Sequence, residues 1–291
     1  DYIDYTDLGT APALAAGRFW REGRVFGYSP DGSTARYLSP EQAASYIVSI
    51  DSDDGNKIRA RNGTTGDLHY FGTDAATVIQ SAINALDTGG VVTIKEGTYD
   101  IATPLTGTKA ETLILRGMGM GSTILNWTGS ERSVLNFDPG SFVTNQQIVL
   151  EDLQVTMTNC ENVTAVNLNR VALAHLQRIW VRTTNKGASS FGFYTSAPGN
   201  NSLVMIDCRS SNFDVNFKIY TDHVFMARCQ AIYGSKGFWF ATGGAEIVGA
   251  NLTAYHQTNE ETSVGFHIDY GSYPGQLTLI SPYSENQAGG D

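Results

Sequence analysis

The segments LVMIDC at residues 203–208 and VFMARC at residues 224–229 share one pattern of apolar and polar positions. Four other segments align with them, and the six segments begin 21 to 30 residues apart. Self-similarity with a period of this length is typical of a solenoid, in which each repeat forms one coil of a shared core. The other segments are residues 148–153 (IVLEDL), 174–179 (AHLQRI), 247–252 (IVGANL) and 277–282 (LTLISP).

Between these segments lie shorter runs in which apolar residues occupy alternating positions, as they do in β-strands. Each coil therefore has at least two strands and no helix, which excludes leucine-rich and helical repeats. The remaining architecture is a parallel β-helix, whose coils stack about 4.8 Å apart and bury one continuous apolar column. The apolar residues of these runs are Val166 and Leu168, Phe191 and Phe193, Val215, Phe217 and Ile219, Phe238 and Phe240, and Phe266 and Ile268.

The composition agrees with an all-β chain and excludes several functions. Charged residues make up only 16% of the 291 residues, while Gly, Tyr and Phe are abundant. The net charge of −10 argues against nucleic-acid binding, and no apolar run approaches the roughly 20 residues of a membrane-spanning helix. Three Cys do not make a disulfide scaffold. The chain begins at Asp1 without a signal-peptide pattern, so we expect a processed, trimmed or partial chain.

Residues 1–72 carry no repeat, and we expect them to form a small adaptor that anchors the β-helix of residues 73–291. Its expected elements are a hairpin at residues 18–28, a short helix from Ser39 to about Tyr46 and a hairpin at residues 57–71. Asp74 then caps a predicted helix over residues 74–87, which Gly89 and Gly90 end. Its apolar stripe consists of Val78, Ile79, Ala82, Ile83 and Leu86.

This helix and the following GGVVTIKEGTY at residues 89–99 resemble the entry segment of pectate-lyase-like right-handed β-helix proteins. Residues 115–119 (LRGMG) resemble the L-x-G-x-G segment of the next coil in that superfamily. The resemblance covers about residues 70–291. It implies a right-handed parallel β-helix whose N-terminal end is capped by the helix of residues 74–87.

The resemblance leaves the function open, because the superfamily includes polysaccharide lyases, polygalacturonase-type hydrolases, epimerases, viral tailspikes and non-catalytic surface proteins. The hydrolase motifs Gly-His-Gly and Arg-Ile-Lys are absent, and the only Asp-Asp pair, Asp53-Asp54, lies outside the repeats. The carboxylate cluster of a calcium-dependent lyase is also missing. Tailspike relatives are homotrimers, so the resemblance implies a homotrimer here.

The outward positions of the short runs are the best candidates for a ligand-binding face. Strict alternation predicts one exposed column of Asn167, Asn216, Trp239 and His267, and a second of Asn169, Tyr194, Lys218, Ala241 and Asp269. Aromatic surfaces suit the C–H faces of sugars, while amides and charged groups suit their hydroxyls. A polar outer face that only meets solvent or a partner chain is the alternative. The predicted ligand-binding residues are Asn167, Asn169, Tyr194, Asn216, Lys218, Trp239, His267 and Asp269.

Whether this face catalyses a reaction stays open. Glycoside hydrolysis needs two carboxyl groups about 5–9.5 Å apart. Asp269 and Asp214 are expected about 16 Å apart, too far without a loop donor such as Glu260 or Glu261. A β-elimination lyase needs less, namely a group that neutralises a uronate and a base. If the chain is an enzyme, a lyase is favoured, with His267, Lys218, Tyr194 and Asp269 as the candidate catalytic groups.

Three other patterns have mainly structural interpretations. Cys208 and Cys229 occupy the same inward position on adjacent coils, where a buried stack is favoured over a disulfide or a metal pair. Asp51 and Asp53 resemble half of a calcium loop whose twelfth position is Asn rather than Glu, so a solvated turn is favoured. Ca²⁺ is thus the only cofactor candidate, and none is expected. A ladder of opposite charges is predicted at one turn position, formed by Asp152, Arg178, Asp207, Arg228 and Asn251.

The sequence favours a carbohydrate- or host-surface-binding module of the viral tailspike, fibre or capsid-surface type. A polysaccharide lyase that acts on a uronate polymer and a purely structural decoration protein are the alternatives. The expected partners are a polysaccharide or a glycosylated cell surface, two further copies of the chain and a larger assembly that the N-terminal region joins. The expected location is extracellular or on a virion surface.

Overall fold

The computed structural model describes residues 44–107, 112–138, 143–195, 202–241, 246–257, 264–269 and 276–287, together with the backbone of three strands nearer the N-terminus. These strands, β1 (Arg18–Glu22), β2 (Val25–Ser29) and β3 (Arg36–Leu38), form an antiparallel sheet that includes the first predicted hairpin. Residues 39–43, where the predicted short helix begins, lie outside the described residues. Tyr46, where that helix was expected to end, instead opens the strand β4 (Tyr46–Ile50).

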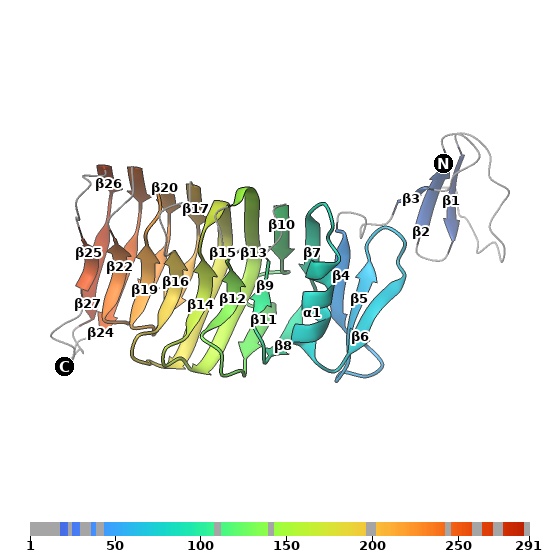
Figure 1. Ribbon diagram of the computed structural model, residues 1–291, viewed down its shortest axis with the longest axis horizontal. Coiled ribbons are helices and arrows are strands. Elements are labelled where there is room, and N and C mark those ends of the chain that lie inside the picture. The colour runs from blue at the N-terminus through green and yellow to red at the C-terminus, as the bar shows by residue number, and fades with distance from the viewer. Residues whose placement is uncertain are drawn as a thin grey trace, which may run out of the picture.

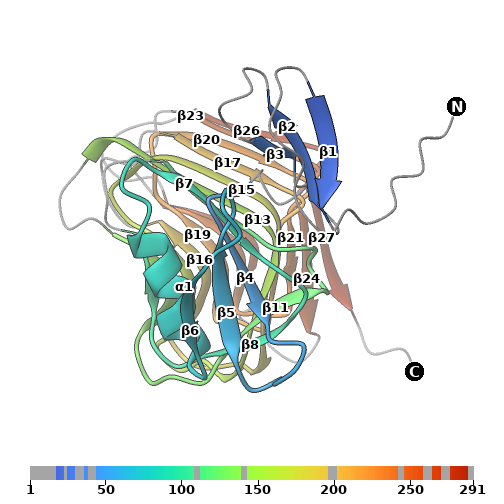
Figure 2. The same ribbon diagram turned by 90° about the vertical axis from the view of Figure 1, so that its right-hand side faces the viewer.

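The second predicted hairpin and the predicted helix are both present. β5 (Ile58–Asn62) pairs antiparallel with β4 and with β6 (Leu68–Gly72). Helix α1 (Ala75–Asn84) begins after Asp74, whose carboxylate accepts a hydrogen bond of 3.0 Å from the Ala76 amide. Its apolar face is buried, and α1 contacts β4, β5 and β6 as well as the first coil. Viewed from the N-terminal end, α1 and β4–β6 lie in front of the coils (Figure 2).

The rest of the described chain is a parallel β-helix with three sheets, which confirms the predicted architecture (Figure 1). The first sheet continues from β4 through β7 (Gly90–Ile94), β10 (Thr112–Arg116), β13 (Val143–Asn159), β15 (Val171–Asn185), β17 (Ser202–Ile206), β20 (His223–Ala227), β23 (Glu246–Ala250) and β26 (Gln276–Ile280).

The second sheet shares the long strands β13 and β15 with the first, because both strands bend around a corner of the coil. Its other strands are β8 (Gly97–Ile101), β11 (Thr123–Trp127), β18 (Arg209–Ser211), β21 (Gln230–Ile232), β24 (Thr253–Gln257) and β27 (Tyr283–Gln287). The third sheet consists of β9 (Leu105–Thr106), β12 (Ser133–Phe137), β14 (Thr164–Leu168), β16 (Phe191–Thr195), β19 (Val215–Ile219), β22 (Lys236–Phe240) and β25 (Val264–Ile268).

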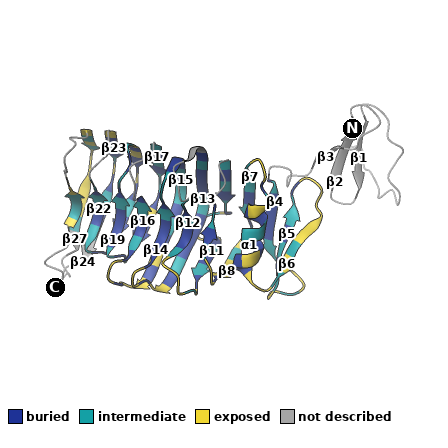
Figure 3. Ribbon diagram, in the orientation of Figure 1, coloured by how far each residue is buried: buried dark blue, intermediate teal, exposed yellow. Residues whose placement is uncertain are grey.

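The six aligned sequence segments stack in register on the first sheet. Their first residues pair rung by rung, in the order Ile148, Ala174, Leu203, Val224, Ile247 and Leu277. The first five of these side chains are buried, and Leu277 in the last described coil is partly buried. The sequence period therefore corresponds to one coil, and buried positions recur along the row of coils (Figure 3).

An aromatic stack forms the part of the core that lies behind the third sheet. Phe193, Phe217, Phe238 and Phe266 pair in register, and their ring centroids are 4.9, 4.7 and 5.2 Å apart. These spacings match the distance of about 4.8 Å between neighbouring strands, so each ring packs against the next without distortion of the ladder.

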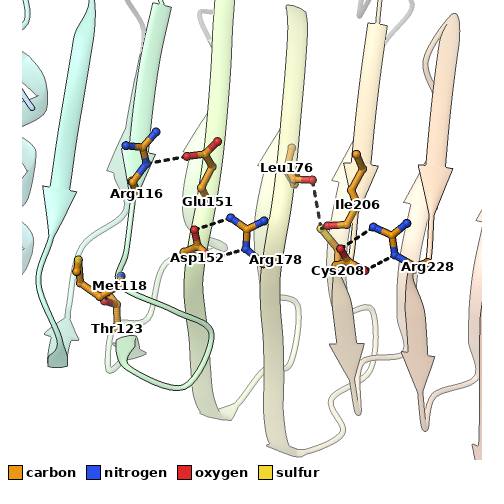
Figure 4. A network of polar contacts seen from close by, with 11 residues as sticks. Arg116, Met118, Thr123, Glu151, Asp152, Leu176, Arg178, Ile206, Cys208 and Arg228 are labelled. Carbon is orange, nitrogen blue, oxygen red and sulfur yellow. Dashed lines mark hydrogen bonds and ion pairs between the residues drawn. The ribbon is translucent and has the colours of Figure 1, made fainter. Parts of the chain in front are cut away.

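The corner between the first two sheets carries the predicted ladder of charges (Figure 4). Asp152, Arg178, Asp207 and Arg228 all have a φ between 53° and 58°, so each coil turns through a left-handed residue. Arg178 donates two hydrogen bonds to Asp152, and Arg228 donates two to Asp207. The guanidinium of Arg228 lowers the pKa of the Asp207 carboxyl. These pairs lie at the surface, the Arg178–Asp152 pair partly buried and the Arg228–Asp207 pair exposed. Surface pairs of this kind contribute at most about 1 kcal/mol each, so they join neighbouring coils and form no site.

The residue after each corner points into the core. Cys208 and Cys229 follow Asp207 and Arg228, and both side chains are buried, free and on adjacent coils. The predicted buried stack is therefore confirmed in place of a disulfide. Both thiols donate to carbonyl groups of the preceding strands, including that of Leu176.

Candidate ligand-binding face

One outward column on the third sheet holds most of the predicted ligand-binding side chains. Asn167, Tyr194, Lys218, Trp239 and His267 occupy the same register position on β14, β16, β19, β22 and β25. The prediction divided these residues between two columns, with Tyr194 and Lys218 in the second, and that division is wrong. We name this column, together with Phe191 and Lys236, the aromatic–lysine face.

The division failed because it set β16 and β19 two residues out of register with their neighbours: Tyr194 pairs with Asn167, and Lys218 with Trp239. The strands of the third sheet also do not alternate strictly. The position that precedes the Phe stack is buried on every coil from β14 to β22, so two consecutive residues on these strands point inward. Ala165, Gly192 and Gly237 are small enough to fit there, and a Cβ on Gly237 would already touch Ala231 and Ala254 of the second sheet. This extra inward residue leaves Phe191 and Lys236, at the starts of their strands, on the outer face, whereas strict alternation from Phe193 and Phe238 would turn them inward.

Asn216 occupies this inward position on β19, which removes it from the predicted ligand-binding face. It is only 1% exposed. Its side-chain oxygen accepts a hydrogen bond of 2.7 Å from Ser210 Oγ, and its Nδ2 donates one of 3.1 Å to the Tyr233 carbonyl. Both polar atoms are satisfied inside the coil, so Asn216 has a structural role.

Asn169 and Asp269 lie beyond the ends of their strands, apart from the column. The backbone amide of Asn169 donates to Phe137, and that of Asp269 donates to Phe240 on the preceding coil. Nδ2 of Asn169 donates to Asp138, which also forms an ion pair with Arg170. Asn169 thus belongs to a charged group at one corner, while Asp269 is exposed.

Two lysines and three aromatic rings make the centre of the aromatic–lysine face. Nζ of Lys218 lies 4.3 Å from the centroid of the Trp239 ring and 5.0 Å from that of Tyr194. Nζ of Lys236 lies 4.0 Å from the Trp239 centroid. Phe191 stacks on Tyr194 with centroids 4.9 Å apart. Ammonium groups at these distances from ring faces are held by cation–π attraction.

The environment of Lys218 makes its charged form less favourable than that of a lysine in water. Burial lowers the pKa of Lys218 below the usual lysine value, the ammonium of Lys236 lowers it further, and Asp269 opposes both. His267 completes the column, because its ring meets that of Trp239 edge-on with centroids 5.2 Å apart. Sequence analysis missed Lys236 and Phe191, since their outward position depends on the extra inward residue in each strand.

A shallow groove continues the face toward the N-terminal coils. It has a volume of about 310 Å³ and runs past Asn167 and Tyr194. Nδ2 of Asn167 donates to the side chain of Asn136 on the preceding coil, which fixes the amide against the groove. The remaining lining residues are Arg132, Ser133, Asn162, Thr164, Ser189 and Phe191. Amides, hydroxyls, one arginine and two aromatic rings therefore line this groove beside the two lysines.

The geometry disfavours a pair of catalytic carboxylates. Asp214 precedes β19 and Asp269 follows β25, so the two lie at opposite ends of strands two coils apart. Strand rise and coil spacing put them roughly 20 Å from each other, farther than the sequence suggested and beyond the range for glycoside hydrolysis. Glu260 and Glu261, the suggested loop donors, lie outside the described residues. Of the candidate catalytic groups, Tyr194, Lys218 and His267 share the column and Asp269 does not.

The weak calcium candidates are engaged with each other and with an arginine. Asp51 is buried and forms an ion pair with Arg59, and its Oδ1 accepts a hydrogen bond of 2.9 Å from the Asp53 amide. Within the described ranges, no group of three or more His, Cys, Asp or Glu side chains is arranged to hold a metal ion. In the same part of the chain, no helix is both long and apolar enough to span a membrane.

Comparison with known proteins gives little beyond the geometry. No family model matches the chain, and no curated protein matches it. Among solved structures, the chain is similar to ORF18 of Geobacillus virus E2, with 14% sequence identity and a TM-score of 0.42. The match covers 82% of this chain and 69% of the viral one. A similarity at this level carries no argument about function.

Proposed function

We propose that this chain is a carbohydrate-binding β-helix protein of the virion-surface type, which recognises a glycan on a cell surface. The observation that carries the proposal is the aromatic–lysine face beside the groove of Asn167 and Tyr194. A rigid, stacked scaffold holds amides, aromatic rings and cations at coil spacing along one line, which suits an extended chain of sugars. The resemblance to pectate-lyase-like β-helix proteins, a superfamily that includes viral tailspikes, is compatible with this proposal.

Replacing Trp239 is expected to weaken glycan binding at least tenfold, because the ring holds both lysine ammonium groups in place. Binding of wild type and Trp239→Ala to a glycan array, followed by titration of the best glycan, measures this effect. Trp180→Ala is the matched control, since Trp180 also faces outward and carries a cation, Arg182, but lies on the second sheet. Equal binding by wild type and Trp239→Ala, with unchanged thermal midpoints, would contradict the proposal.

A polysaccharide lyase is the second candidate, favoured by the lowered pKa of Lys218 next to Tyr194 and by His267 in the same column. A lysine with a lowered pKa gives up its proton more readily, and β-elimination needs a base beside the sugar ring. Incubation with uronate polymers tests this candidate through the absorbance of unsaturated chain ends. If the protein binds no glycan on the array and cleaves no uronate polymer, the third candidate, a structural decoration protein, is favoured.

Self-association of parallel copies is proposed through an apolar stripe on the outer face of the first sheet. Phe225 is 43% exposed, and it shares a column with Val204 and Val248 beside a groove of about 260 Å³. Exposed apolar surface of this kind marks interaction sites. The stripe runs along the coil axis, so the same apolar residues of a parallel copy can contact it at each successive coil. A homotrimer arranged in this way, with residues 1–72 as its anchor, is consistent with a location outside cells or on a virion.

Phe225→Lys is expected to convert this trimer to monomers, because it places a charge in the middle of the stripe. Light scattering coupled to gel filtration measures the mass. Phe71→Lys is the control, since Phe71 is 50% exposed but lies on β6, away from the stripe. A wild-type monomer, or a trimer that Phe225→Lys leaves intact, would contradict this interface.

A further inference from the structure

Two ammonium groups lie over a single indole ring at the centre of the aromatic–lysine face. Nζ of Lys236 and Nζ of Lys218 are 4.0 and 4.3 Å from the Trp239 centroid. Burial lowers the pKa of Lys218, and the ammonium of Lys236 lowers it further. Two like charges gathered on one ring cost free energy unless an opposite charge joins them.

The described residues supply no such charge in direct contact. Neither Lys218 nor Lys236 forms an ion pair with a carboxylate of the described residues, and Asp269 acts on Lys218 only through space. Elsewhere, Lys57, Arg116 and Arg170 each have a carboxylate partner.

The ring of Trp239 is already occupied by its neighbours. Lysine ammonium groups lie over the ring, and the His267 ring meets it edge-on. The indole ring is therefore engaged with two cations before any ligand arrives. The groups that the site offers to a ligand are the N–H donors of the two lysines, and the indole serves to hold them.

We infer that Lys218 and Lys236 together bind one anionic group of the glycan, a carboxylate or a sulfate, so that the ligand of this face is an acidic glycan. This inference rests on the proposed function and names its substrate class. Charge-assisted N–H···O bonds from two lysines are strong, and the anion removes the repulsion between them. The groove past Tyr194 and Asn167 then receives the neighbouring, uncharged part of the sugar chain.

The test is a binding comparison between acidic glycans and their neutralised forms. The probes are hyaluronan, alginate, polysialic acid and heparan sulfate, each beside its carboxyl-reduced form and, for heparan sulfate, its desulfated form. Wild type is expected to bind at least one acidic probe and to lose about tenfold or more in affinity when the recognised anion is removed. The arm that loses binding shows whether a carboxylate or a sulfate is recognised. Affinity is also expected to fall as salt rises.

The variants Lys218→Ala and Lys236→Ala are each expected to weaken binding of that probe about tenfold, while Lys236→Arg retains it. Lys57→Ala is the matched control, because Lys57 also lies over an aromatic ring, that of Phe71, but has Asp54 as its partner. Two results would overturn the inference: neutral forms bound as tightly as acidic ones, or a Lys218/Lys236 double variant that binds like wild type. Either result would leave the proposed glycan binding itself unaffected. No binding to any glycan would overturn the proposed function itself.

Discussion

Phe217→Ala is expected to lower the free energy of unfolding by about 4 kcal/mol. Phe217 is fully buried, and its ring stacks between Phe193 at 4.9 Å and Phe238 at 4.7 Å. Its removal takes apolar surface out of the core and leaves a cavity that neighbouring coils cannot close, because hydrogen-bonded ladders hold them at a set spacing. Denaturant unfolding followed by circular dichroism measures the loss.

Two further variants keep this prediction testable if Phe217→Ala does not fold. Phe217→Leu retains most of the volume and is expected to cost about 1.5 kcal/mol. Phe71→Ala removes a ring that is 50% exposed and is expected to change stability by no more than about 0.5 kcal/mol. Equal losses for Phe217→Ala and Phe71→Ala would show that the aromatic stack does not support the fold.

Gly117→Ala is expected to cost about 3 kcal/mol, because the new methyl group has no space. A Cβ on Gly117 would lie against the carbonyl oxygen of Asp152, at the left-handed corner of the next coil, and 2.8 Å from Thr123 Cβ. That carbonyl already accepts a hydrogen bond of 2.8 Å from the Gly119 amide, so it has no freedom to move away. The coil of β10–β12 would have to separate from the coil of β13 and β14.

Gly121→Ala is the control for this prediction, since it lies in the same loop and a Cβ there meets nothing within 4 Å. It is expected to be neutral or slightly stabilising, by less than about 1 kcal/mol, through the loss of freedom in the unfolded chain. Thermal and denaturant midpoints of both variants measure the difference. A Gly117→Ala protein as stable as Gly121→Ala would contradict the close approach of the two coils.

The resemblance to an L-x-G-x-G segment has a physical basis in this corner. Gly117 is required by the contact with Asp152, whereas Gly119 has a φ of +140°, which residues with a side chain rarely adopt. The motif thus specifies the close packing of one coil against the next at this corner. It contains no information about the third sheet, where the candidate site lies.

The sequence alone determined the coil period and the inward columns of the first sheet. Both depend on apolar residues at regular intervals, from Ile148 to Leu277, and on the strict alternation of strands in that sheet. The cap of α1 at Asp74 and the stack of Cys208 on Cys229 were predictable for the same reason, since each follows from local pattern and register.

Only the tertiary structure decided which side chains meet on the third sheet. There, Ala165, Gly192 and Gly237 let two consecutive residues face the core, so Lys236, which precedes Gly237 on its strand, stays on the outer face and Asn216 lies inside. The register of β19 with β22 then brings Lys218 beside Trp239, next to Lys236. Small residues permit the extra inward position because they fit against the second sheet. That contact joins two separate sides of the coil, so the local pattern of one strand does not reveal it.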